Sequence, residues 1–164
     1  MTAPRLAAAL AGMLTALLLQ AALIGPLTFP VPVSLPALLV IVVGIYAGPG
    51  IGMSLGFATG LLADLGSGLP AGTQALCWLA AGLVAGMLGG LVSPRGTRAV
   101  AGLAAVLAAG SSLTSGVLLA VLGSPGASLA ATAAGVLPVG LLDALLGLLL
   151  APLVRGLLRG QGIR

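Results

Sequence analysis

The sequence predicts an all-α integral membrane protein built as a bundle of six transmembrane helices. Its 164 residues are 60% hydrophobic and only 5% charged, whereas a typical soluble domain carries about 25% charged residues. Its mean hydropathy is +1.30, and several apolar stretches approach or exceed the ~20 residues with which a helix crosses a bilayer. We therefore expect residues 1–164 to form a single transmembrane domain with little polypeptide outside the lipid.

The first predicted span follows a short N-terminal segment. Leu6 to Ile24 is apolar except for Thr15 and Gln20, and the Gln20 amide could hydrogen-bond to another helix. A signal peptide could begin in this way, but the run is longer than its usual apolar region, so we expect a retained span. The prolines that follow exclude a continuous helix there, at positions Pro26, Pro30, Pro32 and Pro36.

Glycine and proline clusters separate the remaining spans. Gly48-Pro49-Gly50 ends the second apolar run, and Gly66–Pro70 ends the third. Polar turns at Ser93–Arg98 and Gly123–Ser128 separate the last three runs. The six predicted spans cover residues 6–24, 35–47, 51–65, 73–92, 100–122 and 129–150. Spans two and three, at roughly 20 Å by helical rise, would be thin crossings.

The distribution of arginine predicts the orientation. With six spans, all six basic residues fall on one side of the membrane, whereas merging spans two and three would isolate Arg5 from the rest. The positive-inside rule makes that side cytoplasmic, so both termini are expected there. The six are Arg5, Arg95, Arg98, Arg155, Arg159 and Arg164.

Composition excludes several function classes. The net charge of +4 comes from thinly spread arginines, and one Trp, one Tyr and two Phe are too few to stack on bases, so nucleic acid is not an expected partner. The chain has no histidine and a single cysteine, Cys77, which excludes Ser-His chemistry, an internal disulfide and a multi-cysteine metal site. We therefore expect no enzymatic activity, no cofactor and no metal.

Glycines recur every fourth residue in the third and fourth spans. This spacing puts them on one face of a helix, where they let a neighbouring backbone approach closely. We expect these faces to pack helices together or to bind a partner. The glycines are Gly48, Gly52, Gly56, Gly60, Gly82, Gly86 and Gly90.

Asp64 follows the first glycine series and is one of two acidic residues. It opposes the negative end of its own helix, whereas the free N–H groups at the start of the next span can bind an anion. We expect Asp64 to fasten this hairpin near Thr73 and Gln74, with partner binding and ion or proton binding as alternatives.

Asp143 lies inside the sixth span, where an acid is expensive and is usually paired or functional. We expect a protonated Asp143 that hydrogen-bonds to a backbone carbonyl or to the hydroxyls of span five. A proton or cation site and a contact with another subunit are the alternatives. In span four, we expect Trp78 to anchor at the outer interface and Cys77 to act as a small apolar filler.

The third span and its turn resemble a known family. GFATGLLAD (Gly56–Asp64), followed by LPAG (Leu69–Gly72) and Ala75-Leu76, resembles the GF-x-x-GL-x-x-D…P-x-G…AL pattern of MreD, the bacterial rod shape-determining membrane protein. Leu18-Leu19-Gln20, the run from Pro36 to Pro49 and the closing run from Pro138 into a basic tail are similar too. The chain departs from the family at Ala37, where an acid is common.

The resemblance implies a non-enzymatic subunit of the cell-elongation machinery in the bacterial cytoplasmic membrane. Its implied partners are an MreC-like membrane protein, a RodA-type glycosyltransferase and a class B penicillin-binding protein, and its role is to guide peptidoglycan synthesis. The alternative is the substrate-binding component of an energy-coupling-factor vitamin transporter, whose architecture the MreD family is expected to share. Such a component needs polar and aromatic groups around a pocket, for which Trp78 is the candidate platform.

Overall fold

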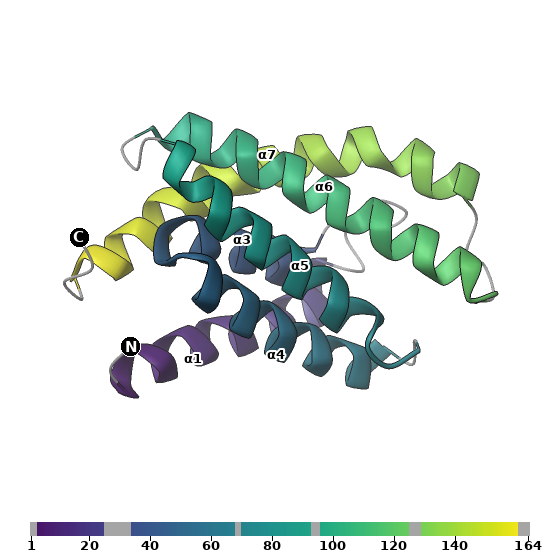
Figure 1. The fold of residues 1–164 in the computed structure, drawn as a ribbon, viewed down its shortest axis with the longest axis horizontal. Coiled ribbons are helices and arrows are strands. Elements are labelled where there is room, and N and C mark those ends of the chain that lie inside the picture. The colour runs from purple at the N-terminus through teal and green to yellow at the C-terminus, as the bar shows by residue number, and fades with distance from the viewer. Residues whose placement is uncertain (1–2, 25–33, 68–69, 93–95, 125–128, 161–164) are drawn as a thin grey trace.

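The computed structural model describes residues 3–24, 34–67, 70–92, 96–124 and 129–160, and within them every regular element is a helix. The predicted proline turn at 26–32, Arg95 and Arg164 lie outside the described residues. Six α-helices follow one another (Figure 1): α1 (Ala3–Leu19), α3 (Leu35–Ala47), α4 (Pro49–Ser67), α5 (Thr73–Leu88), α6 (Thr97–Val121) and α7 (Leu129–Gly160). A π-helical turn, η1 (Gln20–Ile24), continues α1, and a 3₁₀ turn, η2 (Gly89–Leu91), continues α5.

The central element is α3, which contacts each of the other five α-helices. In Figure 1 it lies behind α5, with α6 and α7 on one side and α4 and α1 on the other. Its Leu38, Val40, Ile41 and Val42 are fully buried. The β-branched and leucine side chains of α3 thus form the core around which the other helices pack.

Local sequence fixes both ends of α3. Ser34 is its N-cap, with Oγ accepting a hydrogen bond from the Ala37 N–H at 3.4 Å, and Pro36 occupies the first turn, where a missing N–H costs nothing. Gly48 ends the helix with φ +93°, a conformation that favours glycine. Because α4 begins at the next residue, Pro49, the predicted break between spans two and three is present.

Two helices are longer than the apolar runs predicted for them. The third predicted span covers residues 51–65, whereas α4 runs from Pro49 to Ser67 over 19 residues, and it is not one of the three described segments that are long and apolar enough to cross a membrane. The sixth was expected to end at residue 150, but α7 continues to Gly160 through Pro152. Proline at this position removes only the bond to the Leu148 carbonyl, and helices in membranes tolerate such a loss when neighbouring groups compensate.

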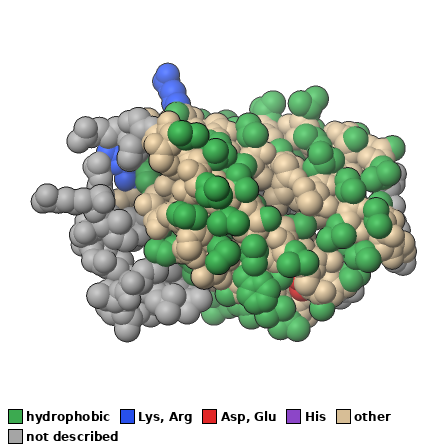
Figure 2. Space-filling model, in the orientation of Figure 1, with side chains coloured by type: hydrophobic (Ala, Val, Ile, Leu, Met, Phe, Trp, Pro, Cys, Tyr) green, Lys and Arg blue, Asp and Glu red, His purple; other side chains and the backbone are tan. Residues whose placement is uncertain are grey.

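Large apolar side chains cover the outside of the bundle, as Figure 2 shows for one face. On α7, Leu137, Leu141 and Leu149 are 65% or more exposed, whereas Asp64 and Asp143 are 3% and 1% exposed. Three described helical segments are long and apolar enough to cross a membrane: Thr73–Leu91, Thr97–Val121 and Thr132–Gly156. This distribution, with polar groups inside and leucine outside, identifies a membrane protein.

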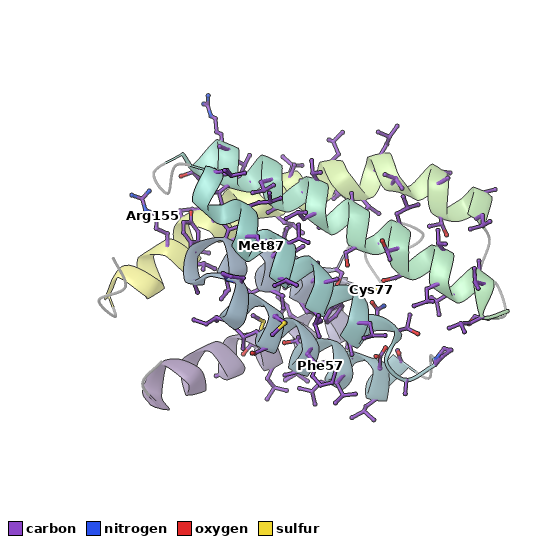
Figure 3. The ribbon with its side chains drawn as sticks, in the orientation of Figure 1. Phe57, Cys77, Met87 and Arg155 are labelled. Atoms are coloured by element: carbon purple, nitrogen blue, oxygen red, sulfur yellow. The ribbon has the colours of Figure 1, made fainter. Side chains whose placement is uncertain are left out.

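The arginine-bearing helix ends lie at one end of the molecule. Figure 1 shows the start of α1 and the end of α7 together on the left, where α6 also begins. Arg155 lies at this end in Figure 3, and Arg98 belongs to the first turn of α6. The opposite end carries the starts of α3, α5 and α7 and the end of α6.

Candidate functional site

The glycines of α4 and α5 bring the two backbones into direct contact. A Cβ built on Gly52 would overlap the Gly82 carbonyl, and one built on Gly56 would overlap the Trp78 carbonyl. A Cβ on Gly60 would lie 2.6 Å from the Ala75 Cα. These contacts lie inside the fold, so the glycine faces pack α4 against α5 and are not open to a partner.

Two glycines of the predicted series have other surroundings. A Cβ on Gly48 or on Gly90 would meet no atom within 4 Å, so neither position needs glycine for space. Gly48 instead supplies the positive φ that ends α3, while Gly90 is an exposed residue of the turn η2. Gly86, by contrast, packs against Pro49 at the start of α4.

Asp64 fastens the α4–α5 hairpin. Its Oδ2 accepts hydrogen bonds from the Gly72 N–H at 2.9 Å and the Ala75 N–H at 3.1 Å, and its Oδ1 accepts one from the Gln74 N–H at 3.0 Å. This contact with the first turn of α5 is the one that the sequence predicts. The carboxylate faces the positive end of the α5 dipole, which compensates for its position at the negative end of α4.

The turn before α5 explains why Asp64 is needed there. Gly72 is the N-cap of α5, has φ +96° and offers no side chain to bind the free N–H groups. Thr73 turns its hydroxyl back to the Pro70 carbonyl at 2.9 Å. A side chain from the preceding helix therefore caps α5, which couples the two helices.

A second cap of this kind joins η1 to α3. The Gln20 Oε1 accepts a hydrogen bond from the Leu35 N–H at 2.9 Å. The interhelical hydrogen bond expected for Gln20 is therefore present, and its partner is the free first turn of α3. Asp64 and Gln20 therefore each accept a backbone hydrogen bond at the start of a later helix.

Trp78 was expected at the outer interface, and this prediction is wrong. Its side chain is 5% exposed and packs with Ala37 and Cys77 in a small buried cluster. The reason lies in α4, whose Gly56 backbone touches Trp78 and draws that part of α5 into the bundle. Cys77 is a buried free thiol, in agreement with its predicted filling role.

A cavity of about 190 Å³ lies beside Trp78, between the N-terminal ends of α3, α5 and α7 and the C-terminal half of α6. Most of its lining is apolar, and we call it the polar cavity after the hydroxyl and amide groups in its wall. The hydroxyls of Ser112, Ser115 and Thr132 line it together with the Gln74 amide, and Ser115 Oγ donates to Gln74 Oε1 at 3.3 Å. Charged side chains are absent from its described lining. Such a cavity can bind water or a small neutral polar molecule.

Of this cavity, only Trp78 was predicted from the sequence, as the candidate platform of a ligand pocket under the transporter alternative. The run of hydroxyls in span five was a second signal, because Ser112 and Ser115 fall there. The contributions of Ser34, Gln74 and Thr132 depend on three other helices meeting α6 at the same end. Sequence spacing within one helix does not contain that information.

Asp143 lies away from the hydroxyls that were expected to bind it. Its Oδ1 is buried and has no hydrogen-bond partner among the described residues, and the same holds for Ser111 Oγ. On α6, Ala101 faces Gly147 and Ala109 faces Gly140, so Asp143 lies level with an alanine-rich stretch. The serines of α6 lie nearer to its C-terminal end, and at Oδ1 the predicted hydrogen bond to these hydroxyls or to a backbone carbonyl is absent.

No group of three His, Cys, Asp or Glu side chains that could hold a metal ion occurs among the described residues. The chemistry that these residues do offer is hydrogen bonding: helix capping by Asp64 and Gln20, and the lining of the polar cavity. Searches against protein-family models, curated proteins and solved structures find no match for this chain.

Proposed function

We propose that this chain is a non-enzymatic subunit of the bacterial cell-elongation machinery, which binds an MreC-like membrane protein and helps to guide peptidoglycan synthesis. The observation that carries this proposal is the segment from Gly56 to Ala75, which resembles the MreD pattern. In the structure, its glycines and Asp64 are the residues that join α4 to α5. Asp64 holds two helices together in this segment and offers no reactive group. This is what we expect of a subunit that acts by binding other proteins.

The proposal includes six spans in the bacterial cytoplasmic membrane, with both termini on the cytoplasmic side. The grouping of the α1 start, the α6 start and the α7 end at one end of the bundle supports this orientation, because the arginines belong to these segments. The RodA-type glycosyltransferase and the class B penicillin-binding protein are further proposed partners within the same assembly.

The polar cavity favours a second function, the substrate-binding component of an energy-coupling-factor transporter. The helix ends that line it lie opposite the arginine-bearing end, so with cytoplasmic arginines it would face the outside. Trp78 lines the cavity as well, as an aromatic platform for a ligand would. The lining is, however, mostly apolar, and besides Trp78 its polar groups are only four hydroxyl side chains and the Gln74 amide.

Co-purification separates the two functions. The tagged full-length chain is purified in mild detergent from its native membrane, and its partners are identified by mass spectrometry, with an unrelated tagged membrane protein as control. An MreC-like protein with wall synthases is the expected result. Transporter ATPases with a coupling membrane protein would instead establish the transporter component and contradict the elongation subunit.

A further inference from the structure

The polar cavity contains hydrogen-bond donors that the described fold leaves unused. The Gln74 Oε1 accepts a hydrogen bond from Ser115 Oγ at 3.3 Å, but the Gln74 amide N–H groups donate to no described residue. The Ser112 hydroxyl also lines the cavity and has no partner in the described part of the chain. Since polar groups in protein interiors are as a rule hydrogen-bonded, these donors point to a molecule that occupies the cavity.

Trp78 adds a further donor, and it is almost fully buried. Its side chain is 5% exposed, and its indole N–H has no partner among the described residues. The indole nitrogen is not closed off by protein atoms, in contrast to Ser111 Oγ and Asp143 Oδ1. Because Trp78 lines the cavity, a molecule inside the cavity can accept a hydrogen bond from it.

The unused groups of the cavity are mainly donors. Indole and amide N–H groups cannot accept hydrogen bonds, and the Gln74 oxygen already has a donor in Ser115. Ser34 Oγ accepts from the Ala37 N–H at 3.4 Å, which leaves the hydroxyl proton of Ser34 to donate. An occupant that matches this lining therefore carries acceptor oxygens.

The surroundings of the cavity favour a neutral molecule. Its described lining has no charged side chain that could pair with an ion. The Asp64 carboxylate lies just behind the lining, because it accepts a hydrogen bond from the Gln74 backbone N–H at 3.0 Å. An anion in the cavity would be repelled by this carboxylate and would lack a cation, and a buried unpaired charge is costly. A cation would face the donor N–H groups.

The size and the apolar part of the cavity indicate a small organic molecule. An apolar cavity of about 150 Å³ holds one benzene molecule, and the polar cavity measures about 190 Å³. Its apolar side chains, on which water finds no partner, belong to Leu113, Leu119, Val136 and Val139. A short carbon skeleton can pack on this apolar wall while its oxygens reach the donors.

We propose that the polar cavity binds a small neutral molecule with carbonyl oxygens, in the class of lactones, lactams and short esters. The oxygens accept from the N–H groups of Trp78 and Gln74, and the carbon skeleton packs on the apolar wall. The elongation role needs no such ligand, so this inference goes beyond that role and does not rest on it. Under the transporter alternative, it names the chemical class of the ligand.

The single tryptophan of the chain reports on the cavity directly, because Trp78 lines it. The full chain is purified in mild detergent, and its tryptophan fluorescence is recorded during titration with three probes of nearly equal size: γ-butyrolactone, butyrate and benzene. γ-Butyrolactone should give a saturable change with a dissociation constant in the millimolar range, as is usual for so small a ligand. Butyrate, its charged counterpart, should bind at least about tenfold more weakly, and benzene should also bind more weakly. N-acetyltryptophanamide in the same detergent corrects for unspecific quenching.

Variants of the lining test the donors and the cavity separately. Gln74→Leu removes the amide donors but keeps the backbone N–H that Asp64 binds. It should weaken γ-butyrolactone binding about fivefold, the usual effect of one hydrogen bond, and leave benzene binding unchanged, which shows that the cavity still forms. Ser112→Leu should fill the cavity and abolish binding of both probes. Thr114→Leu is its matched control on α6, because Thr114 is exposed and does not line the cavity.

Reconstitution in nanodiscs distinguishes a free ligand from an ester group of the lipid. If the natural ligand is a free molecule, γ-butyrolactone should bind equally in nanodiscs of ester-linked and of ether-linked phosphatidylcholine. Loss of binding in the ester-linked lipid alone would show that lipid carbonyl groups occupy the same donors, which supports the carbonyl chemistry with the membrane as its source.

Three results would overturn the inference. Absence of a saturable change with γ-butyrolactone in detergent would show a cavity that holds water alone. Tighter binding of butyrate would contradict the neutral class, and tighter binding of benzene without an effect of Gln74→Leu would contradict the role of the donors. None of these results bears on co-purification with an MreC-like protein, so the inference and the proposed function fail separately.

Discussion

Asp64 and Asp143 are the two acidic residues of the chain, and their surroundings differ. Both are almost fully buried, but Asp64 accepts three backbone hydrogen bonds, whereas Asp143 Oδ1 has no partner among the described residues. A carboxylate that caps a helix is used as an acceptor at both oxygens. Asp143 does not use its Oδ1 as a hydrogen-bond acceptor within the described residues.

This contrast gives a prediction at the residue scale. Asp64→Asn keeps only one acceptor oxygen, so even with that oxygen turned toward Gly72 and Ala75 the Gln74 N–H loses its acceptor, and the free energy of unfolding should fall by about 1–3 kcal/mol. Asp143→Asn should change it by less than about 1 kcal/mol. Unfolding of each variant by SDS in mixed micelles measures both. An Asp64→Asn variant as stable as wild type would show that the hairpin does not depend on the carboxylate.

The same scale shows why some residue predictions succeeded. Asp64 and Gln20 each accept a hydrogen bond from a free backbone N–H group at the start of the next helix. The sequence shows both where such a helix starts and which polar side chain lies near it. The position of Trp78 depends on how α5 rotates about its own axis. Because α5 is apolar on all sides, its composition did not show that Gly56 would draw the Trp78 side inward.

At the scale of the elements, turn chemistry decided how well boundaries were predicted. The bounds of α3 agree with the prediction at both ends, since Ser34, Pro36 and Gly48 act within one turn of the helix. The sixth span was predicted to end at residue 150, just before Pro152, whereas α7 continues through this proline to Gly160. A single proline costs one hydrogen bond, and continuous packing of the helix can outweigh that loss.

The α4–α5 contact gives a prediction at this scale. Gly60→Ala adds a Cβ that would lie 2.6 Å from the Ala75 Cα, and backbone atoms cannot rotate away, so α4 and α5 must separate. The variant should lose about 1–3 kcal/mol of unfolding free energy. Gly102→Ala is the control, because its Cβ meets open space and alanine favours helix by up to about 1 kcal/mol. Equal stability of the two variants would contradict close packing at Gly60.

At the scale of the whole molecule, the arrangement of polarity is that of a protein surrounded by lipid. Valine, alanine, glycine and the few polar side chains fill the interior, while leucines of α4, α5 and α7 face outward. Composition alone predicted this class, because 60% hydrophobic residues cannot all be buried in 164 residues. The full lining of the polar cavity could not be predicted, since it depends on the spacing between helices that are distant in sequence.

The orientation of the bundle can be tested with single cysteines. In a Cys77→Ala background, Ala71→Cys places an exposed thiol in the turn between α4 and α5, and Ala99→Cys places one beside Arg98 in the first turn of α6. Both original side chains are exposed, so the variants should fold normally.

If the arginine-bearing end is cytoplasmic, a membrane-impermeant maleimide should label Ala71→Cys in intact spheroplasts and Ala99→Cys only after permeabilisation. The physical reason is that positive charge is retained on the cytoplasmic side, while the Asp64-capped turn has no described basic side chain within it. Labelling of both thiols from outside would place the two turns on the same side of the membrane. In that case α5, which lies between residues 71 and 99, would not cross the membrane. Labelling of Ala99→Cys alone would invert the molecule, and the polar cavity would then open to the cytoplasm.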